Sequence, residues 1–342
     1  MKTNKTYIGL ILLAAGLLAG CSGSEGNDVN ELKPELTNEA EKTEISVKTN
    51  LSRMLTGTRA TAYTSNTVLQ TTDLKVDAYF NGLNTKYLNG AKLHYNPAHS
   101  PSPAWVFWSG DEETHYYWPI EGSVYDPSSA NITVGSLDFV GYCPFEKPPY
   151  IVDGPTYDYS AGTITFTSQL DDYMTSTAQA DIKEFMCAMT TNRRAAGGAV
   201  PLDFKHSFAY IKFNLSTATT KNVKVNYIKI DGLLTRGVCC FTGSTSTSVW
   251  SSRSNNAMMT LTEELQRDVR EETSPFLVIP YDSYPTKTLT VKVTWTVWDE
   301  EHEQVYDVPL DIDWQPGYSY TYTLTITKDD LKVDINRYTE QW

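Results

Sequence analysis

Apolar and polar residues alternate in many short segments of this chain, which is the pattern of β-strands that bury one face. In the first such segment Ile45, Val47 and Leu51 fall on one face, and mostly polar residues fall on the other. The alternation recurs in segments farther along the chain, at 74–80, 209–215, 291–297 and 318–326. Gly, Pro, Asn and Asp separate these segments, as they do at turns. The pattern predicts a mainly β protein.

Two details refine this prediction. One long alternating segment changes phase at Asn226–Tyr227, which predicts a β-bulge there. Only the segment 260–272 has helical spacing, because Leu261, Leu265 and Val269 recur at every fourth position. We therefore expect one helix among many strands.

The length and one break in the pattern predict two domains. At about 150 residues per domain, 342 residues suit about two. The segment 192–199 has no apolar period and contains two Gly and two Arg, which is typical of a connection between domains. Short strands on both sides of it favour two tandem β-sandwiches, at 44–196 and 197–342.

The charge balance excludes one class of partner. Lys and Arg number 28 against 41 Asp and Glu, a formal net charge of −13. This is the wrong sign for neutralising a phosphate backbone, so we expect no nucleic acid partner. Hydrophobic residues at 40% are enough for packed cores.

The N-terminus reads as an export signal. Lys2 and Lys5 precede an apolar stretch, residues 8–18, that is short for a membrane span and typical of a signal peptide. The sequence Leu-Ala-Gly-Cys at 18–21 resembles a bacterial lipobox, in which the Cys is acylated after cleavage. We therefore expect a signal peptide at 1–20, lipid on Cys21 and an acidic tether at 21–43. The alternative is an ordinary signal peptide with an incidental Cys.

The remaining cysteines and histidines give no chemical site. Besides Cys21 the chain has four cysteines, none with metal-ligand spacing: Cys143, Cys187, Cys239 and Cys240. We favour buried free thiols, with a Cys143–Cys187 disulfide as the alternative. The histidines are scattered and form no metal-ligand pattern: His94, His99, His115, His206 and His302. The chain also lacks the nucleophile elbow, the phosphate loop and the zinc-protease motif. We expect no metal, no cofactor and no enzymatic activity.

A cluster of aromatic residues between Trp105 and Trp118 has two interpretations. Aromatic side chains pack in sandwich cores, and exposed ones stack on sugar rings. We favour core packing, and exposure of Trp105, Trp108 and Trp118 would favour the sugar platform instead.

Several motifs, in this order, resemble the fimbrillin family, the type V pilins of Bacteroidota. The resemblance covers nearly the whole chain from Cys21, although each motif is loose when taken alone. The motifs are the lipobox, Arg59-Ala60-Thr61, Tyr-Tyr-Trp-Pro at 116–119, Leu-Asp-Phe-Val-Gly-Tyr at 137–142, Leu-Asp-Phe-Lys-His-Ser-Phe at 202–208, Leu-Val-Ile-Pro at 277–280 and Trp-Gln-Pro-Gly-Tyr at 314–318.

The resemblance implies two transthyretin-like β-sandwich domains and export as an outer-membrane lipoprotein. It also implies cleavage after an Arg by a trypsin-like protease, and assembly with other fimbrillin subunits by strand exchange. The matching position for cleavage is Arg59, before Ala60, with Arg53 as its rival. Both lie in a Thr-, Ser- and Gly-rich stretch that a protease can reach.

The alternation supplies a mechanism for such assembly. If the strand in 44–59 completes the first sandwich and cleavage releases it, an open sheet edge remains that can accept another strand. The tail at 329–342 offers one, because Leu331, Val333 and Ile335 alternate with polar residues. The alternative is that this tail is an ordinary edge strand of its own domain.

The function expected from these observations is a structural subunit of surface fimbriae, held to the outer membrane until it is cleaved. The alternative is a lipid-anchored tip or anchor adhesin, or a glycan-binding surface lipoprotein.

Overall fold

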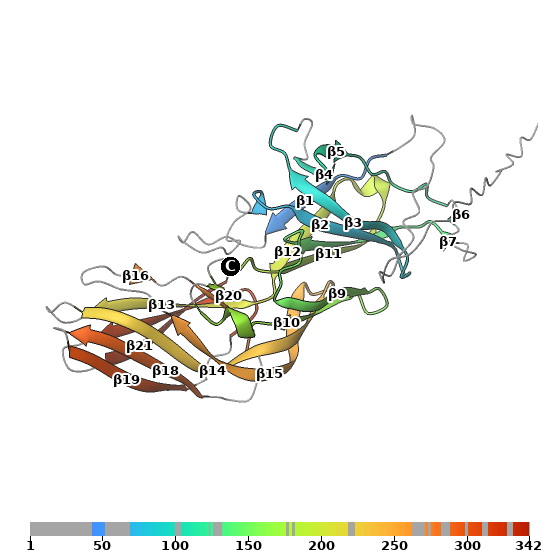
Figure 1. The fold of residues 1–342 in the computed structure, drawn as a ribbon. Helices are drawn as coiled ribbons and strands as arrows, with labels where there is room; N and C mark the ends of the chain where they lie inside the picture. The colour runs from blue at the N-terminus through green and yellow to red at the C-terminus, as the bar shows by residue number, and fades with distance from the viewer. Residues whose placement is uncertain are drawn as a thin grey trace, which may run out of the picture. The chain divides into compact units, whose positions relative to one another are not determined.

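The structure of the chain is a computed structural model, shown in Figure 1. It describes residues 43–51, 69–99, 104–122, 124–125, 132–175, 178–179, 182–217, 223–261, 271–272, 275–281, 288–297, 300–309, 314–326 and 331–341. Strands make up most of these residues, which confirms the mainly β prediction. No helix within the described ranges has both the length and the apolar character needed to cross a membrane.

The largest sheet has eight strands in the order β1-β12-β11-β8-β2-β3-β4-β5. Its strands are β1 (Val47–Leu51), β2 (Leu74–Phe80), β3 (Lys86–Tyr95), β4 (Trp105–Ser109), β5 (Glu112–Thr114), β8 (Leu137–Cys143), β11 (Met186–Arg193) and β12 (Val200–His206). Strand β2 is nearly fully buried, so residues on both of its faces lie in packed surroundings. The alternation at 74–80 therefore marks a central strand that is covered on both sides.

A second sheet has six strands, with β14 at its centre. The strands are β9 (Ile151–Asp158), β10 (Thr163–Gln169), β14 (Val223–Thr242), β15 (Thr247–Leu261), β18 (Thr288–Val297) and β19 (Glu300–Pro309). The first part of β14 pairs with β18 and its last part pairs with β10. The β14–β18 register shifts between Val225 and Tyr227, which confirms the predicted bulge.

A third sheet has five strands and carries the end of the chain. Its strands are β13 (Ala209–Thr217), β16 (Glu271–Glu272), β17 (Phe276–Val278), β20 (Tyr318–Ile326) and β21 (Leu331–Gln341). Tyr320 and Tyr322 of β20 are buried, and the Tyr322 hydroxyl accepts a 2.8 Å hydrogen bond from Trp314 Nε1. Strand β20 is therefore anchored in the core by its side chains as well as by its neighbours.

The remaining elements are short. Strands β6 (Val124–Tyr125) and β7 (Ile132–Thr133) form a two-stranded sheet. Two 3-10 turns, η2 and η3, cover Asp171–Tyr173 and Ala195–Gly197.

The segment 192–199 is not a connection between sheets. It links β11 to β12, which are antiparallel neighbours in the eight-stranded sheet, and it contains the turn η3. The chain instead leaves that sheet after β8, returns to it at β11 and leaves it again after β12. Polar and glycine-rich composition marks a turn between paired strands as well as a linker, so composition alone could not separate the two. The division into domains at 44–196 and 197–342 stays a prediction.

The prediction of a helix at 260–272 is wrong, because both ends of this segment are strands. Thr260 and Leu261 end β15, where they pair with Lys229 and Ile228 of β14. The far end of the segment forms the short strand β16. Pairing with a long neighbouring strand overrides a helical spacing that rests on three apolar residues.

Candidate functional site

The candidate site is the place of the first strand at the edge of the eight-stranded sheet. Strand β1 pairs in parallel with β12, in an unbroken register from Val47 opposite Val200 to Leu51 opposite Phe204. Figure 1 shows β1 beside β12, although about 150 residues separate them in the sequence. The predicted strand is therefore present, and its partner lies in the second half of the chain.

The residues just before β1 are held on the other side by a different segment. The Ile45 N–H donates a 2.7 Å hydrogen bond to the Tyr116 carbonyl, and the Trp118 N–H donates a 2.8 Å bond to the Thr43 carbonyl. The Val200 N–H donates a 2.8 Å bond to the Ser46 carbonyl. Residues 43–51 thus lie between β12 on one side and residues 116–118 on the other, and we call this place the leader slot.

The apolar side chains of this segment fill the leader slot. Ile45, Val47 and Leu51 have exposed fractions of only 1%, 0% and 5%. They belong to one buried cluster that also contains Phe204 and Trp118. Lys48 and Asn50 are exposed on the opposite face, as the alternation predicts.

One polar contact joins the start of this segment to its neighbour. Glu44 Oε1 lies 2.8 Å from His115 Nδ1, and both side chains are about half exposed. The hydrogen bond to Glu44 raises the pKa of His115, and the negative charges of Glu44 and Glu113 act in the same direction. The histidine is more readily protonated while residue 44 is in place.

The tail at the other end of the chain is also an edge strand. Strand β21 pairs antiparallel with β20, with Leu331 opposite Ile326 and Val333 opposite Leu324. The register then shifts between Thr321 and Thr323, and Ile335 lies in this irregular stretch. The tail therefore occupies the place that the sequence left open as its alternative, in the sheet of its own chain.

The residues predicted for lipidation and cleavage lie outside the described part of the chain. These are Cys21, Arg53, Arg59 and Ala60. Their roles stay predictions.

The described cysteines are free thiols. Cys143, Cys187 and Cys239 are buried, and Cys240 is partly buried. In the β8–β11 register Cys187 lies opposite Tyr142 and Met186 opposite Cys143, so the side chains of Cys143 and Cys187 point to opposite faces of the sheet. This geometry excludes the alternative disulfide. Burial raises the pKa of the Cys187 thiol well above its usual range.

The aromatic cluster belongs to the core. Trp105 and Trp118 have exposed fractions of 7% and 6%, and Trp108 is partly buried against His94. Trp118 packs edge-on against Phe139. These rings do not form an open stacking platform, and the described residues contain no His, Cys, Asp and Glu group that could hold a metal.

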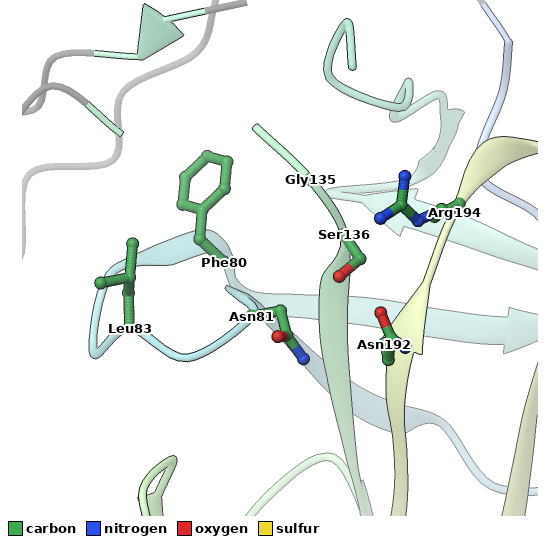
Figure 2. A pocket seen from close by; sticks show the side chains of 7 residues that line it. All are labelled: Phe80, Asn81, Leu83, Gly135, Ser136, Asn192 and Arg194. Atoms are coloured by element: carbon green, nitrogen blue, oxygen red, sulfur yellow. The ribbon is translucent and has the colours of Figure 1, made fainter. Parts of the chain in front are cut away.

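A polar pocket of about 250 Å³ lies at the ends of β2, β8 and β11. Figure 2 shows Phe80 and Leu83 on one side of it, Asn192 and Arg194 on the other, and Ser136 between them. Asn81, in the turn after β2, also lines it.

The buried carboxylate of Asp138 lies next to this pocket. Its Oδ1 accepts hydrogen bonds from Asn81 Nδ2 at 2.8 Å and from the Asn192 N–H at 2.7 Å. Its Oδ2 accepts a bond from the Tyr157 hydroxyl at 3.2 Å. Burial, together with the Asp138 charge, raises the pKa of Tyr157, so the phenol keeps its proton and acts as the donor.

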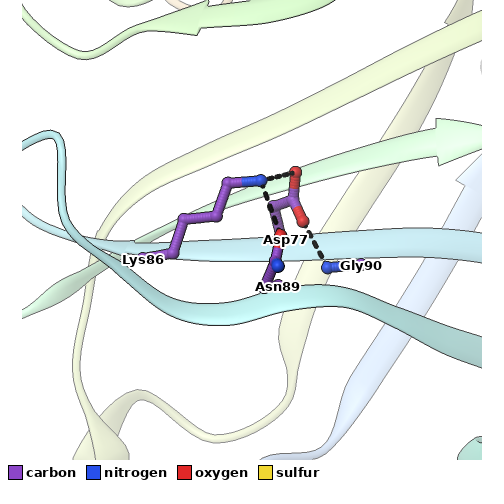
Figure 3. A network of polar contacts seen from close by, with 4 residues as sticks. All are labelled: Asp77, Lys86, Asn89 and Gly90. Carbon is purple, nitrogen blue, oxygen red and sulfur yellow. Dashed lines mark hydrogen bonds and ion pairs between the residues drawn. The ribbon is translucent and has the colours of Figure 1, made fainter. Parts of the chain in front are cut away.

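A second buried carboxylate, Asp77, has a different environment. Figure 3 shows that it accepts a hydrogen bond from Lys86 Nζ at 3.1 Å and another from the Gly90 N–H at 2.5 Å. Lys86 also donates to Asn89 Oδ1 at 2.9 Å. This network joins β2 to β3 within the sheet, which is a structural role, whereas Asp138 fixes two residues that line a pocket.

Sequence reasoning missed three parts of these sites. It did not identify β12 as the partner of β1, although Val200, Leu202 and Phe204 alternate like a strand. It missed the backbone of residues 115–118, which the sequence marks only as an aromatic run. It missed the pocket, because no local pattern brings the turn at residue 81 close to Asn192.

Two solved structures have a similar fold. The structure is similar to that of a fimbrial protein from Bacteroides vulgatus, with a TM-score of 0.55 and 14% identity over 87% of this chain and 99% of that one. It is also similar to a cell adhesion protein from Bacteroides uniformis, with a TM-score of 0.51 and 14% identity over 89% and 99% of the two chains. At this identity the likeness concerns the fold. No curated protein matches the sequence.

The sequence itself identifies the family. Residues 108–342 match the model of the fimbrillin-like family, which is more than half of the chain. The chain therefore belongs to the fimbrillin-like family, as the motifs predicted. Family membership supports a role as a fimbrial subunit at the cell surface. The matched region begins after β1 and includes β12 and β21.

Proposed function

We propose that this protein is a structural subunit of fimbriae whose first strand is a temporary occupant of the leader slot. In this proposal the chain reaches the outer membrane as a lipoprotein acylated on Cys21. A trypsin-like protease cuts it after Arg59, or after Arg53, and a strand of another subunit replaces β1. The observation that carries the proposal is the burial of Ile45, Val47 and Leu51 in a strand at the sheet edge.

The position of β1 supports release after one cut. Only the stretch from residue 52 to residue 73 joins β1 to β2, and it contains both candidate Arg residues. After cleavage there, the leader is held by one parallel ladder, by the backbone bonds to residues 115–118 and by its side chains. Since Cys21 lies on the leader, the same cut separates the folded subunit from its lipid.

An emptied leader slot would attract another strand. The backbone of β12 would become an unpaired sheet edge, and the pockets of three apolar side chains would open to water. Refilling them is worth about 1.5–3 kcal/mol for each side chain, and each ladder hydrogen bond adds about 1 kcal/mol net. Strand addition can therefore be tight without any catalytic residue.

The donor in this proposal is β21 of a neighbouring subunit. Leu331, Val333 and Ile335 repeat the apolar spacing that a slot-filling strand needs. In the single chain β21 already pairs with β20, so donation requires that this pairing be given up first. The irregular register between Thr321 and Thr323 leaves part of β21 without regular pairing, which favours its exchange.

A reversible cross-link across the leader slot tests the proposal. Asn50 and Asp203 are exposed and lie opposite each other on β1 and β12. Strands pair about 4.8 Å apart, which is within the Cα separation that a disulfide spans. We expect the double variant Asn50→Cys, Asp203→Cys to keep its leader after cleavage and to stay monomeric when oxidised.

Reduction should then release the leader and restore polymer formation. The leader is followed by mass spectrometry of the cut protein, and the polymer by negative-stain electron microscopy. The Asn50→Cys single variant is the control and should polymerise in both conditions. Equal polymerisation of the oxidised double variant would show that β1 does not need to leave, and would refute the proposal.

A further inference from the structure

We propose that the pocket beside Asp138 binds one ring of a neutral sugar. This inference does not depend on strand exchange, because the residues that line the pocket lie outside the leader slot. It rests on three features of the pocket: polar groups on an ordered backbone, the balance of charges around them, and a mostly polar lining of the size of one ring.

The backbone that carries the polar group of Asn192 is fixed before any ligand arrives. Asn192 has a φ of 54°, in the left-handed region, and lies within the register shift between Thr190 and Arg193 in the β8–β11 pairing. A bulge of this kind turns a side chain out of the regular alternation. The N–H of Asn192 is held by Asp138, so the backbone is pinned and the side-chain amide lies at the rim of the pocket.

Asp138 also fixes the second amide. Asn81 donates its Nδ2 to Asp138, and its own N–H donates a 2.9 Å bond to the Ser136 carbonyl. One buried carboxylate therefore sets the positions of Asn81 and Asn192 together. The Asn81 side chain and the Asn192 backbone are thus ordered without a ligand, which lowers the entropy cost of binding.

The charges around the pocket favour a neutral ligand. Arg194 is the cation of the lining, and its Nη1 lies 3.2 Å from Glu121 Oε2. Asp138 adds a further negative charge close by. An anionic ligand would have to compete with Glu121 for Arg194 and approach the Asp138 carboxylate. Amide and hydroxyl groups, by contrast, bind uncharged hydroxyls in either direction.

The size and the polar lining favour a sugar among neutral ligands. Asn81, Ser136 and Asn192 line the pocket, whereas the Phe80 ring beside them is buried (Figure 2). A sugar ring has several hydroxyl groups around its edge, so it matches a lining made mostly of polar groups. A volume of about 250 Å³ is just below the range of sites for drug-sized ligands, and so leaves room for one ring.

The test uses methyl glycosides of glucose, galactose, mannose and N-acetylglucosamine at millimolar concentration with the full chain. Saturation-transfer NMR detects weak binding from the ligand's own signals. We expect at least one of these neutral sugars to give a transfer signal. Glucuronic acid and N-acetylneuraminic acid serve as anionic probes, and we expect weaker signals from them. Absence of signal from every neutral sugar overturns the proposal.

Two variants locate the site. Asn192→Gly removes the side-chain amide and keeps both the left-handed backbone and the N–H bond to Asp138, so the fold is retained. We expect it to weaken sugar binding about tenfold or more. Ser246→Gly is the matched control, because Ser246 also has a left-handed φ, of 51°, in the turn between β14 and β15. Equal binding by the wild type and Asn192→Gly overturns the proposal.

A further variant tests whether the pocket binds neutral rather than anionic sugars. Arg194→Gln keeps a hydrogen-bond donor and removes the positive charge, so we expect a loss of less than about threefold for a neutral sugar. If only the anionic sugars bind, and Arg194→Gln abolishes their signal, the pocket is an anion site and the assignment to neutral sugars is wrong.

Discussion

The two terminal strands of the described chain, β1 and β21, are both edge strands, but they are held in different ways. β1 runs parallel to β12 in a register without a shift, and the residues before it are bonded to a second segment. β21 runs antiparallel to β20, with an irregularity in the middle of the pairing. The first strand is held by a regular ladder and buried side chains, and the last by an interrupted ladder. The ladder of β21 has eight paired positions against five for β1, so the proposed exchange requires β21 to give up an extended, interrupted pairing and β1 to be released by the cut.

The largest expected effect comes from removing the last strand. Deleting residues 329–342 should leave a folded monomer, because β20 keeps its eight-pair parallel register with β13 and its buried tyrosines. The cleaved deletion variant should form no fibres, since it has no donor strand. Size-exclusion chromatography and electron microscopy measure the two outcomes.

A matched pair of substitutions accompanies this deletion. Val333→Asp should reduce fibre yield by at least about tenfold by placing a charge on the apolar face of the donor. Lys332→Asp should have little effect, because residue 332 alternates onto the polar face. Undiminished fibres from the deletion variant would exclude β21 as the donor.

An intermediate effect on the stability of the uncut protein is expected from a substitution in the leader slot. Val47 is fully buried, so Val47→Asp should lower the free energy of unfolding of the uncut protein by about 3 kcal/mol or more. Lys48→Asp, on the exposed face, is the control and should change it by less than about 0.5 kcal/mol. Urea unfolding measures both.

The Val47→Asp variant should affect the stability of the uncut protein and of the fibre differently. In the proposed assembly the leader leaves after cleavage, so fibres made from Val47→Asp should resist urea as well as wild-type fibres do. If the fibres are weakened as much as the uncut protein, β1 has remained in its slot and the contrast between the two strands fails.

The smallest expected effect concerns pH. In the uncut protein Glu44 raises the pKa of His115, so Glu44→Gln should lower the midpoint of the His115 titration. The stabilisation from this pair is fully present below the unfolded pKa of about 6.5 and is lost as pH rises through the raised folded value. Both side chains are about half exposed, so the effect on stability is small.

Histidine ring signals in NMR measure this titration. Release of the leader should shift the midpoint in the same direction as Glu44→Gln. A midpoint that stays unchanged in both cases would mean that the contact does not form in solution.

The sequence predicted strands better than it predicted their partners. The alternation of Ile45, Val47 and Leu51 corresponds to buried positions in β1, and the phase change at Asn226–Tyr227 corresponds to a bulge in β14. Both features depend on the local period of two, which a single segment carries. The pairing of β1 with β12 depends on residues about 150 positions apart, and alternation carries no information about it.

The wrong and missing predictions have related causes. The spacing of Leu261, Leu265 and Val269 predicts a helix from residue 260, but Thr260 and Leu261 pair with β14, and this pairing determines their conformation. Asn192 was expected in a linker, and its role at the pocket arises from a bulge and from the buried Asp138. In each case a contact made by a distant segment decides the outcome.

The free thiols have a practical consequence. Cys143, Cys187 and Cys239 are shielded from solvent, and no disulfide joins the described cysteines. The sheets are held by backbone ladders and apolar packing, which mild reductants leave untouched. Dithiothreitol should therefore act on an engineered cross-link alone, and any fibre that dissolves in it would reveal a covalent bond between subunits.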